Sequence, residues 1–219
     1  MNIILLTTTV NVHNKRFLRE IDPLERIQSY TKSVSQWLTK TNLKIVVVEN
    51  SGYIFPEWDE YKEIYKDRFE IISFRESELE QARYLEHDVS KGASEIFAIE
   101  YAYLNSKWIS SHSDFIIKIT GRFFIPGLES FLENLDIDKY DVFSQNDIDE
   151  CQMVGVKYSY FYNVFFPKLI NKNGQYDPHV ENIYRERINN FPIERILRCP
   201  QFDIELTLGG GGPKKYYYI

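Results

Sequence analysis

The stretch KIVVVENSG, residues 44–52, decides the fold class of this chain. Its continuous apolar and β-branched run is typical of a parallel strand that is buried on both faces of a sheet. The run ends abruptly in an acid, an amide, a serine and a glycine, residue types that favour a turn. The stretch therefore predicts a central strand that delivers polar side chains to a loop at its carboxyl end.

A second strand and a helix precede this stretch. Residues 3–6 read IILL and are followed by Thr7, Thr8 and Thr9, which predicts a buried strand that opens into a polar loop. From Pro23 onward, apolar residues recur at steps of three and four, as expected of an amphipathic helix that can end near residue 42. The first 52 residues therefore predict a strand-helix-strand unit.

The same alternation continues downstream and predicts an α/β fold. Apolar runs predict further strands at 69–74, 115–119 and 140–144. Segments between them predict helices at 58–65, 93–104 and 128–135. Beyond residue 146 we expect strands or extended aromatic segments at 153–156 and 160–166, then a helix at 180–189. The predicted architecture is a single domain with an open, mostly parallel, mixed sheet flanked by helices.

Composition and charge exclude several classes of protein. The 219 residues carry 26 Lys and Arg against 32 Asp and Glu, and this acidic balance argues against nucleic acid as the main partner. The two isolated cysteines, Cys151 and Cys199, are too few for a disulfide framework and favour a reducing compartment. The apolar start of the chain is too short for a signal peptide, and no run is long enough to span a membrane. We therefore expect a cytoplasmic protein.

Polar residues at the predicted strand ends are the first candidates for a binding site, because ligands of open α/β sheets bind beyond the carboxyl ends of the strands. A further pair, Lys91 and Gly92, opens a predicted helix. The strand-end candidates are Thr7, Thr8, Thr9, Glu49, Asn50, Ser51, Thr120, Gly121 and Arg122.

Each candidate has a functional and a structural interpretation. Glu49 and Asn50 can read the edge of a nucleobase or a ribose hydroxyl, or they form an ordinary turn. Lys91 at a helix N-terminus suits a phosphate, or this segment is a capped helix. Arg122 can bind a diphosphate through two parallel hydrogen bonds, or it forms a structural salt bridge. The sequence leaves these alternatives open.

Acidic spacings and one histidine are candidates for metal binding and proton transfer. Asp147 and Asp149 follow a predicted strand and could share Mg²⁺ or Mn²⁺ with a diphosphate, or they form a surface turn. His179 lies two residues before Glu181, so the two could supply a metal ligand and a general base, or the histidine is structural. Lys214 follows a glycine run and could close over a phosphate, or it belongs to a disordered end.

Together these motifs resemble a family of small nucleotide-sugar-dependent glycosyltransferases of the GT-A fold, found in large algal viruses and in bacterial surface-polysaccharide loci. The resemblance covers about the first 125 residues. It rests on LLTTT at 5–9, Arg26 before Tyr30, VVENSG at 47–52, Lys91-Gly92 with Glu95, and IKITGRF at 117–123.

The resemblance implies a donor site in the first half of the chain and an acceptor site in the second. Residues 1–125 would bind a nucleotide-sugar donor, with UDP favoured, and residues 126–208 a glycan or glycoprotein acceptor, as in viral capsid or surface-polysaccharide glycosylation. Residues 209–219 are predicted to be a flexible tail. The implied nucleotide-binding residues are Thr7, Thr8, Arg26, Glu49, Asn50, Ser51, Lys91, Gly92 and Arg122.

The chain departs from the resemblance at the Asp-x-Asp metal motif. This position reads Thr120-Gly121-Arg122, so either Arg122 replaces the charge of the divalent cation, or Asp147, Asp149 and His179 supply the metal ligands. An inverting transfer also needs a carboxylate to take the proton of the acceptor hydroxyl. The candidates for this base, in order, are Glu181, Asp149 and Glu95.

The sequence leaves open the role of the aromatic residues in the second half and the activity of the protein. The aromatic side chains could stack on an acceptor sugar or could belong to the core, and they are Tyr158, Tyr160, Phe161 and Tyr162. Besides a glycosyltransferase, the sequence is compatible with a catalytically silent protein that binds a nucleotide or a sugar, and with a nucleotidyltransferase.

Overall fold

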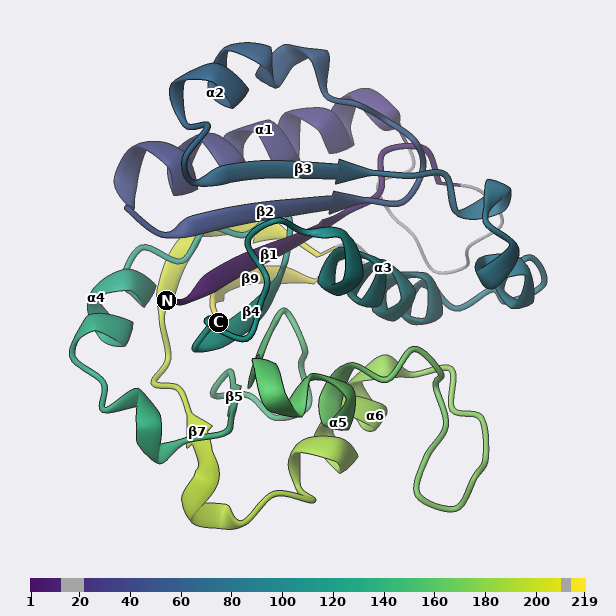
Figure 1. Cartoon of the computed structure of the whole chain (residues 1–219), viewed down its shortest axis with the longest axis vertical. Helices are drawn as coiled ribbons and strands as arrows, with labels where there is room; N and C mark the ends of the chain where they lie inside the picture. The colour runs from purple at the N-terminus through teal and green to yellow at the C-terminus, as the bar shows by residue number, and fades with distance from the viewer. Residues whose placement is uncertain (13–21, 210–213) are drawn as a thin grey trace.

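A seven-stranded sheet forms the centre of the chain in the computed structural model, which describes residues 1–12, 22–209 and 214–219 (Figure 1). Its strands are β1 (Ile3–Thr8), β2 (Lys44–Glu49), β3 (Phe69–Ser73), β4 (Phe115–Thr120), β5 (Val142–Ser144), β6 (Met153–Lys157) and β7 (Ile196–Arg198). Their order across the sheet is β3-β2-β1-β4-β6-β5-β7. Strands from both halves of the sequence therefore belong to one continuous sheet.

Helices and a separate hairpin surround this sheet. The helices are α1 (Pro23–Lys40), α2 (Asp59–Ile64), α3 (Lys91–Asn105), α4 (Leu128–Glu133), α5 (Phe161–Phe165) and α6 (Val180–Ile188). The hairpin pairs β8 (Asp203–Leu208) with β9 (Lys215–Tyr218). Short 3-10 turns occupy Pro56–Trp58, Glu76–Glu78, Glu80–Leu85, Ile137–Lys139, Tyr158–Tyr160 and Ile193–Arg195. No helix in the described ranges is long and apolar enough to cross a membrane.

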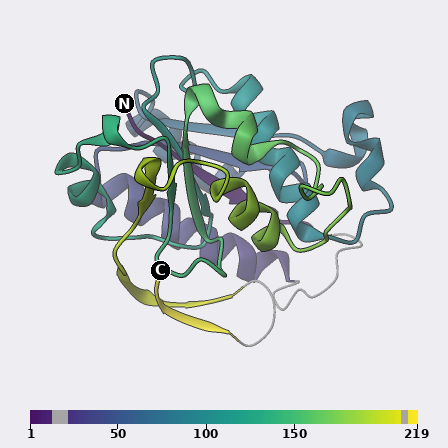
Figure 2. The ribbon, with the colours of Figure 1, turned by 90° about the horizontal axis from the view of Figure 1, so that it is seen from below.

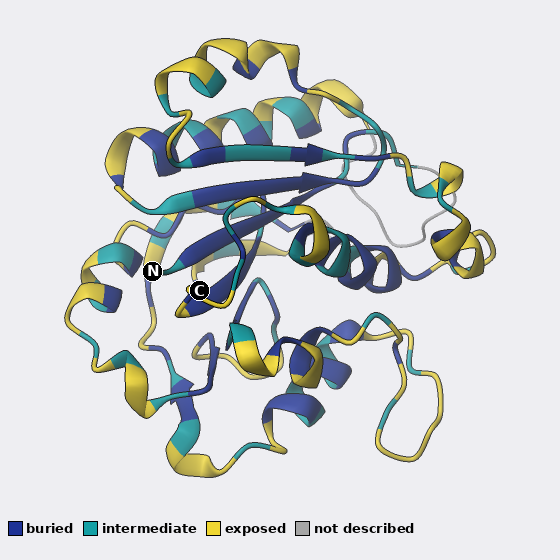
Figure 3. Cartoon of the chain, in the orientation of Figure 1, coloured by how far each residue is buried: buried dark blue, intermediate teal, exposed yellow. Residues whose placement is uncertain are grey.

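The sheet is buried on both faces because successive side chains of a strand point to opposite sides. In β1, Leu5 belongs to the buried cluster that contains the apolar residues of α3, α5 and α6, whereas Leu6 belongs to the cluster that contains those of α1 and α4. Figure 2 shows α1 and the β8–β9 hairpin on one side of the sheet and α3 with α6 on the other. Strands β1 and β2 are accordingly mostly dark blue, that is buried, in Figure 3, whereas the edge strand β3 is partly teal, that is of intermediate burial. The continuous apolar runs of the sequence are thus explained by a sheet between two helical layers.

Helix α1 begins and packs as its sequence predicts. The side chain of Asp22 accepts a hydrogen bond from Leu24 N (2.9 Å), and Pro23 occupies the first turn, where a missing N–H costs nothing. The apolar face of the helix lies on the sheet, and Trp37 is fully buried there. The helix ends at Lys40, two residues before the expected end.

The topology places the carboxyl ends of β1, β2 and β4 at one edge of the sheet. β1 pairs in parallel with both β2 and β4, so Thr8 lies beside Glu49 and Thr7 beside Thr120. β6 then pairs antiparallel with β4 and with β5, which makes the sheet mixed. The predicted fold class, an open and mostly parallel mixed sheet flanked by helices, is confirmed.

Two segments of the second half differ from their predictions. Residues 160–166, expected to be a strand or extended, form a 3-10 turn and helix α5, because Phe161, Val164 and Phe165 recur at helical spacing and are buried together. The end of the chain is not a free tail in its described part. β9 pairs with β8, and Ile219 exchanges two backbone hydrogen bonds with Phe202 (2.8 and 2.9 Å). Residues 210–213 of the glycine run lie outside the described residues.

Candidate functional site

A cavity of about 750 Å³ opens at the shared carboxyl edge of β1, β2 and β4. The amino-terminal ends of α3 and α6 and the β8–β9 hairpin complete its wall. Residues far apart in sequence therefore meet in one concave site, the usual setting for a small-molecule ligand. Ten of the residues predicted to bind the nucleotide or to act as the base line it: Thr7, Thr8, Arg26, Asn50, Ser51, Lys91, Gly92, Glu95, Arg122 and Glu181. The further candidates Thr9, Thr120 and Lys214 line it as well.

The end of β1 and helix α1 position Arg26 in the cavity wall. The guanidinium donates to the carbonyl oxygen of Thr9 through Nε and to the hydroxyl of Tyr30 through Nη2 (2.7 Å). Tyr30 lies one helical turn beyond Arg26, and its hydroxyl donates to the same Thr9 carbonyl (3.2 Å). These contacts orient a cation that is only 4% exposed.

Glu49 does not line the cavity, contrary to the prediction that it reads a nucleobase or a ribose. Its carboxylate accepts hydrogen bonds from the backbone N–H groups of Val10 (2.8 Å), Ser51 (2.9 Å) and Tyr53 (2.9 Å), and from the Ser51 hydroxyl. Burial raises the pKa of this carboxyl, and the four donors act against that rise. With its acceptor capacity used, Glu49 joins the loops that follow β1 and β2 and so supports the residues that do face the cavity.

Asn50 faces the cavity within a chain of side-chain hydrogen bonds. Its Oδ1 accepts from the Thr9 hydroxyl (2.6 Å), and its Nδ2 donates to Glu76 Oε2 (3.1 Å). Glu76 also accepts from the Ser94 hydroxyl on α3 (2.9 Å). Glu76 is not among the residues predicted from the sequence, although it follows β3 and therefore fits the same strand-end pattern. The chain of bonds holds amide and carboxylate groups at the β2–β3 end of the cavity.

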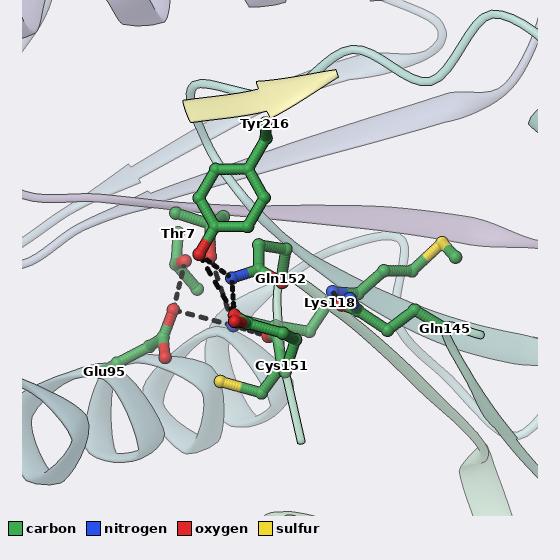
Figure 4. A network of polar contacts seen from close by, with 10 residues as sticks. Thr7, Glu95, Lys118, Gln145, Cys151, Gln152 and Tyr216 are labelled. Atoms are coloured by element: carbon green, nitrogen blue, oxygen red, sulfur yellow. Dashed lines mark hydrogen bonds and ion pairs between the residues drawn. The ribbon is translucent and has the colours of Figure 1, made fainter. Parts of the chain in front are cut away.

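Beneath the cavity, Lys118 and Glu95 form a buried ion pair (Figure 4). Lys118 Nζ lies 2.9 Å from Glu95 Oε1 and donates to the carbonyl oxygen of Cys151 (2.8 Å). The Thr7 hydroxyl donates to the same Glu95 oxygen (2.8 Å). Burial is the largest single influence and lowers the pKa of Lys118, but the charge and hydrogen bond of Glu95, together with Cys151 and Glu181, outweigh it, so the pKa lies above its ordinary value. Lys118 is therefore charged, and it engages the carboxylate that the sequence analysis proposed as a base.

Gly121 allows β4 to approach β1 closely and brings Arg122 into the cavity. Gly121 N donates to the Thr7 carbonyl oxygen (2.9 Å), and a Cβ at position 121 would lie 2.7 Å from that oxygen and 2.6 Å from Thr8 Cγ2. Only glycine fits such an approach. Arg122 follows directly, is 8% exposed and lines the cavity where the resemblance implies an acidic residue.

The amino-terminal ends of α3 and α6 meet at Gly92. A Cβ at this position would lie 2.6 Å from Val180 Cβ, so the glycine is required for the contact between the two helices. The contact brings Lys91 and Glu181 to the same cavity. Neither side chain forms a hydrogen bond or ion pair with another residue in the described part of the chain. A cation and a carboxylate are thus both available to a ligand.

The β8–β9 hairpin contributes residues that local sequence patterns did not single out. Glu150 forms an ion pair with Lys214, and its Oε2 accepts from Gln152 Nε2 (2.7 Å) and from the Tyr216 hydroxyl (3.0 Å). Burial raises the pKa of Tyr216 to about 12. These contacts join the end of the chain to the β5–β6 loop. Lys214, predicted as a lid residue on a flexible tail, lies instead beside a structured strand.

The three predicted metal ligands lie outside the cavity lining. Asp149 pairs with Arg185, and its backbone N–H donates to Asp147 Oδ1 (3.0 Å), so these two acids form a turn. His179 precedes α6, and its backbone N–H donates to Asp177 (2.9 Å). Within the described ranges, no group of three or more His, Cys, Asp or Glu side chains is arranged to hold a metal ion. The structure therefore does not bring Asp147, Asp149 and His179 together, and Asp149 is not placed as a base at the cavity.

The aromatic residues proposed for acceptor binding do not line the cavity, and three of them, Tyr158, Phe161 and Tyr162, pack against Tyr103 of α3. Tyr103 stacks on Phe161 with ring centroids 3.7 Å apart. Tyr158 and Tyr162 also pack against the ring of Tyr103. Tyr160 packs edge-on against Phe191. For Phe161, which is 1% exposed, the alternative of a core residue is the correct one.

Comparison with known proteins identifies the fold. No protein-family model matches the chain, and no curated protein matches it in sequence. The glycosyltransferase GlyE of Streptococcus pneumoniae TIGR4 superposes with a TM-score of 0.51 at 11% identity, over 90% of this chain and 45% of GlyE. TarS 1–349 of S. aureus superposes with a TM-score of 0.48 at 10% identity, over 100% of this chain and 60% of the TarS chain.

A putative nucleotide-diphospho-sugar transferase from Desulfovibrio desulfuricans G20 gives a TM-score of 0.45 at 16% identity, over 91% of this chain and 79% of that one. The chain thus spans about half of the length of GlyE and somewhat more of TarS. At these identities the similarity concerns the fold. The chain has a GT-A-like α/β fold: a mixed, mostly parallel seven-stranded open sheet flanked by helices, with a polar cavity at the carboxyl ends of its strands.

Proposed function

We propose that this protein transfers a sugar from a nucleotide-sugar donor to a surface glycan or a glycoprotein. The observation that carries the proposal is the cavity itself, which gathers most of the residues that the strand-end argument and the resemblance assigned to a nucleotide. Ligands of open α/β sheets bind at this edge, and GlyE, a glycosyltransferase, shares the fold. A UDP-sugar is the donor to test first.

The charges of the cavity suit a departing diphosphate. When the bond between the sugar and the phosphate breaks, negative charge builds on the leaving group, and fixed cations stabilise that charge. Arg122 offers a planar guanidinium that matches phosphate oxygens in pairs. Lys91 adds an ammonium at the N-terminus of α3, a helix of fifteen residues whose first N–H groups favour anions. We assign both residues to the diphosphate.

Glu181 is the general base that the contacts favour for an inverting transfer. Glu95 accepts from Lys118 and Thr7, and Asp149 lies outside the cavity lining in an ion pair with Arg185. Glu181 lines the cavity, and its carboxylate has no protein partner in the described part of the chain. A base must reach the proton of the acceptor hydroxyl directly or through one water molecule. We assign this role to Glu181, because it lines the cavity and its carboxylate is not engaged by another described residue.

Nucleotide binding is the first test of this function. Isothermal titration with UDP, GDP, CMP and ADP should show selective binding of one nucleotide, and Asn50→Ala should weaken it about tenfold or more. Asn163→Ala is the matched control, because Asn163 is exposed and lies outside the cavity lining. Failure of every nucleotide to bind the native protein would overturn the proposal.

Transfer itself is tested at Glu181. With the sugar donor of the nucleotide that binds, Glu181→Gln should lower the turnover number about 100-fold or more and leave the donor Kd almost unchanged. Glu133→Gln, an exposed change of the same kind on α4, should leave both values unchanged. Binding of the nucleotide without any turnover by the unaltered protein, over a panel of sugar donors and glycan acceptors, would indicate a silent binding protein instead.

A further inference from the structure

In the family that this chain resembles, the residues after β4 would hold a metal ion, but this chain has an arginine there. β4 ends at Thr120, whose hydroxyl lies 3.3 Å from Lys118 Nζ, and the next residues are Gly121 and Arg122. Arg122 is 8% exposed and lines the cavity. A buried guanidinium repels a divalent cation at the same place, since like charges interact strongly where water is excluded.

The acidic residues of the cavity do not form a set of metal ligands. Glu76 accepts from Asn50 and Ser94, and Glu95 accepts from Lys118 and Thr7. The third acid, Glu150, accepts from Gln152 and Tyr216 and pairs with Lys214. Of the acids that line the cavity, Glu181 is the one without such a contact in the described part of the chain. A divalent ion held on a diphosphate usually takes carboxylates from the protein, and the donor set here does not fit it.

The cations of the cavity divide into structural ones and ones that face a ligand. Lys118 is fully buried against Glu95, Arg75 pairs with Glu78 (2.7 Å), and Lys214 pairs with Glu150. Arg26 donates to the Thr9 carbonyl oxygen and to the Tyr30 hydroxyl, which hold it in the cavity wall. Lys91 is exposed at the start of α3 and forms no ion pair with another described residue. Arg122, just after β4, and Lys91, at the start of α3, both line the cavity. They bring two positive charges from two different elements, as many as one divalent ion would bring.

We infer that this cavity binds a nucleoside diphosphate without a divalent cation, with Arg122 and Lys91 providing the positive charge. The inference rests on the proposed function and concerns how the same site neutralises the negative charge of the donor's diphosphate. Arg122 contacts the diphosphate from the end of β4, and Lys91 contacts it from the N-terminus of α3. Affinity then depends on these two side chains and on ionic strength, because fixed cations are screened by salt.

The test is isothermal titration of the purified protein with UDP, GDP, CDP and ADP, in EDTA and again in Mn²⁺. For the nucleotide that binds, the two Kd values should agree within about threefold. In EDTA, Arg122→Gln should raise the Kd about tenfold or more, and Lys91→Gln, an exposed change that leaves the core intact, about fivefold. Arg83→Gln removes the same charge from an exposed ion pair with Glu80 and should leave the Kd unchanged.

The outcomes separate this inference from the function on which it rests. Binding that is lost about tenfold or more in EDTA and restored by Mn²⁺ overturns the inference and still supports a nucleotide site. An unchanged Kd in both Arg122→Gln and Lys91→Gln, with each variant folded by circular dichroism, also overturns it. No binding of any nucleoside diphosphate in either buffer overturns the proposed function and the inference with it.

Discussion

Lys118 Nζ lies 2.9 Å from Glu95 Oε1, so the central strand β4 and helix α3 are joined by an ion pair at the floor of the cavity. Lys118 is fully buried, and its carbonyl partner on Cys151 adds a hydrogen bond from the loop before β6. This contact explains a lysine within the otherwise apolar strand FIIKIT. It also gives Glu95 a structural role at the site, since the carboxylate neutralises the buried charge.

The first prediction concerns this ion pair. Glu95→Gln leaves a buried ammonium without its counterion and should lower the free energy of unfolding by about 3 to 5 kcal/mol. Lys118→Met replaces the charge with an apolar side chain of similar length and should cost less. The double variant should be more stable than Glu95→Gln alone, because it no longer buries an unpaired charge.

Urea unfolding of the four proteins measures this cycle at neutral pH. If the losses in free energy of unfolding of the two single variants simply add in the double variant, the pairing of Lys118 with Glu95 is contradicted. As a control, Lys139→Met disrupts an exposed ion pair with Asp136 and should leave the urea midpoint almost unchanged.

Asp141 gives a prediction about pH. Hydrogen bonds from Arg195 (Nε to Oδ2, 2.8 Å) hold the pKa of Asp141 below its ordinary value, although burial opposes the shift. A carboxyl whose folded-state pKa is depressed stabilises the fold above its unfolded-state pKa, near pH 4, and this contribution is lost as the pH falls through the folded-state pKa. Asp141→Asn should therefore cost about 1 to 3 kcal/mol at pH 7.

The same measurement repeated between pH 7 and pH 2 checks the sign. The difference in stability between the unaltered protein and Asp141→Asn should narrow below about pH 4. Asp138→Asn changes an exposed carboxylate nearby and should show no such difference. A gap that stays constant or widens in acid would show that Asp141 is not the titrating group.

Gly121 gives a prediction about packing. Gly121→Ala places a Cβ 2.7 Å from the Thr7 carbonyl oxygen, and a backbone atom cannot rotate away, so β1 and β4 must shift. We expect a loss of about 1 to 3 kcal/mol in urea unfolding. Gly127→Ala is the control, because its nearest neighbour is the Phe202 ring at 3.3 Å, and it should cost less than about 1 kcal/mol. Equal losses in the two variants would contradict the close approach of the strands.

Glu150 gives a prediction about affinity. Glu150→Gln removes a negative charge from the cavity and releases Lys214 from its ion pair, so a nucleoside diphosphate should bind about two- to fivefold more tightly. Stability should change by less than about 1 kcal/mol, because Lys214 is half exposed. Titration with the nucleotide that binds measures the effect.

A matched variant separates this local effect from net charge. Glu205→Gln makes the same change in an ion pair with Lys32, away from the cavity lining, and should leave the Kd unchanged. Weaker binding by Glu150→Gln would contradict this prediction and mean that the Glu150 carboxylate supports the ligand.

Local patterns of the sequence were sufficient for the framework of this protein. The continuous apolar runs predicted strands β1, β2 and β4, and the amphipathic spacing predicted helix α1. A strand buried on both faces gives a continuous apolar run, whereas a helix buried on one face gives apolar residues at steps of three and four. The strand-end argument then predicted the position of the cavity. It worked because carboxyl ends of parallel strands meet at one edge whatever the details of packing.

Contacts between distant residues were decided only by the tertiary structure. Whether an acid faces a ligand depends on which donors surround it. Four donors engage Glu49 and Lys118 engages Glu95, whereas no residue that the structure describes engages the Glu181 carboxylate. Asp149 likewise pairs with Arg185 rather than with a metal set. Residue type and local spacing carry no information about such partners, because packing brings them together from segments far apart in the chain.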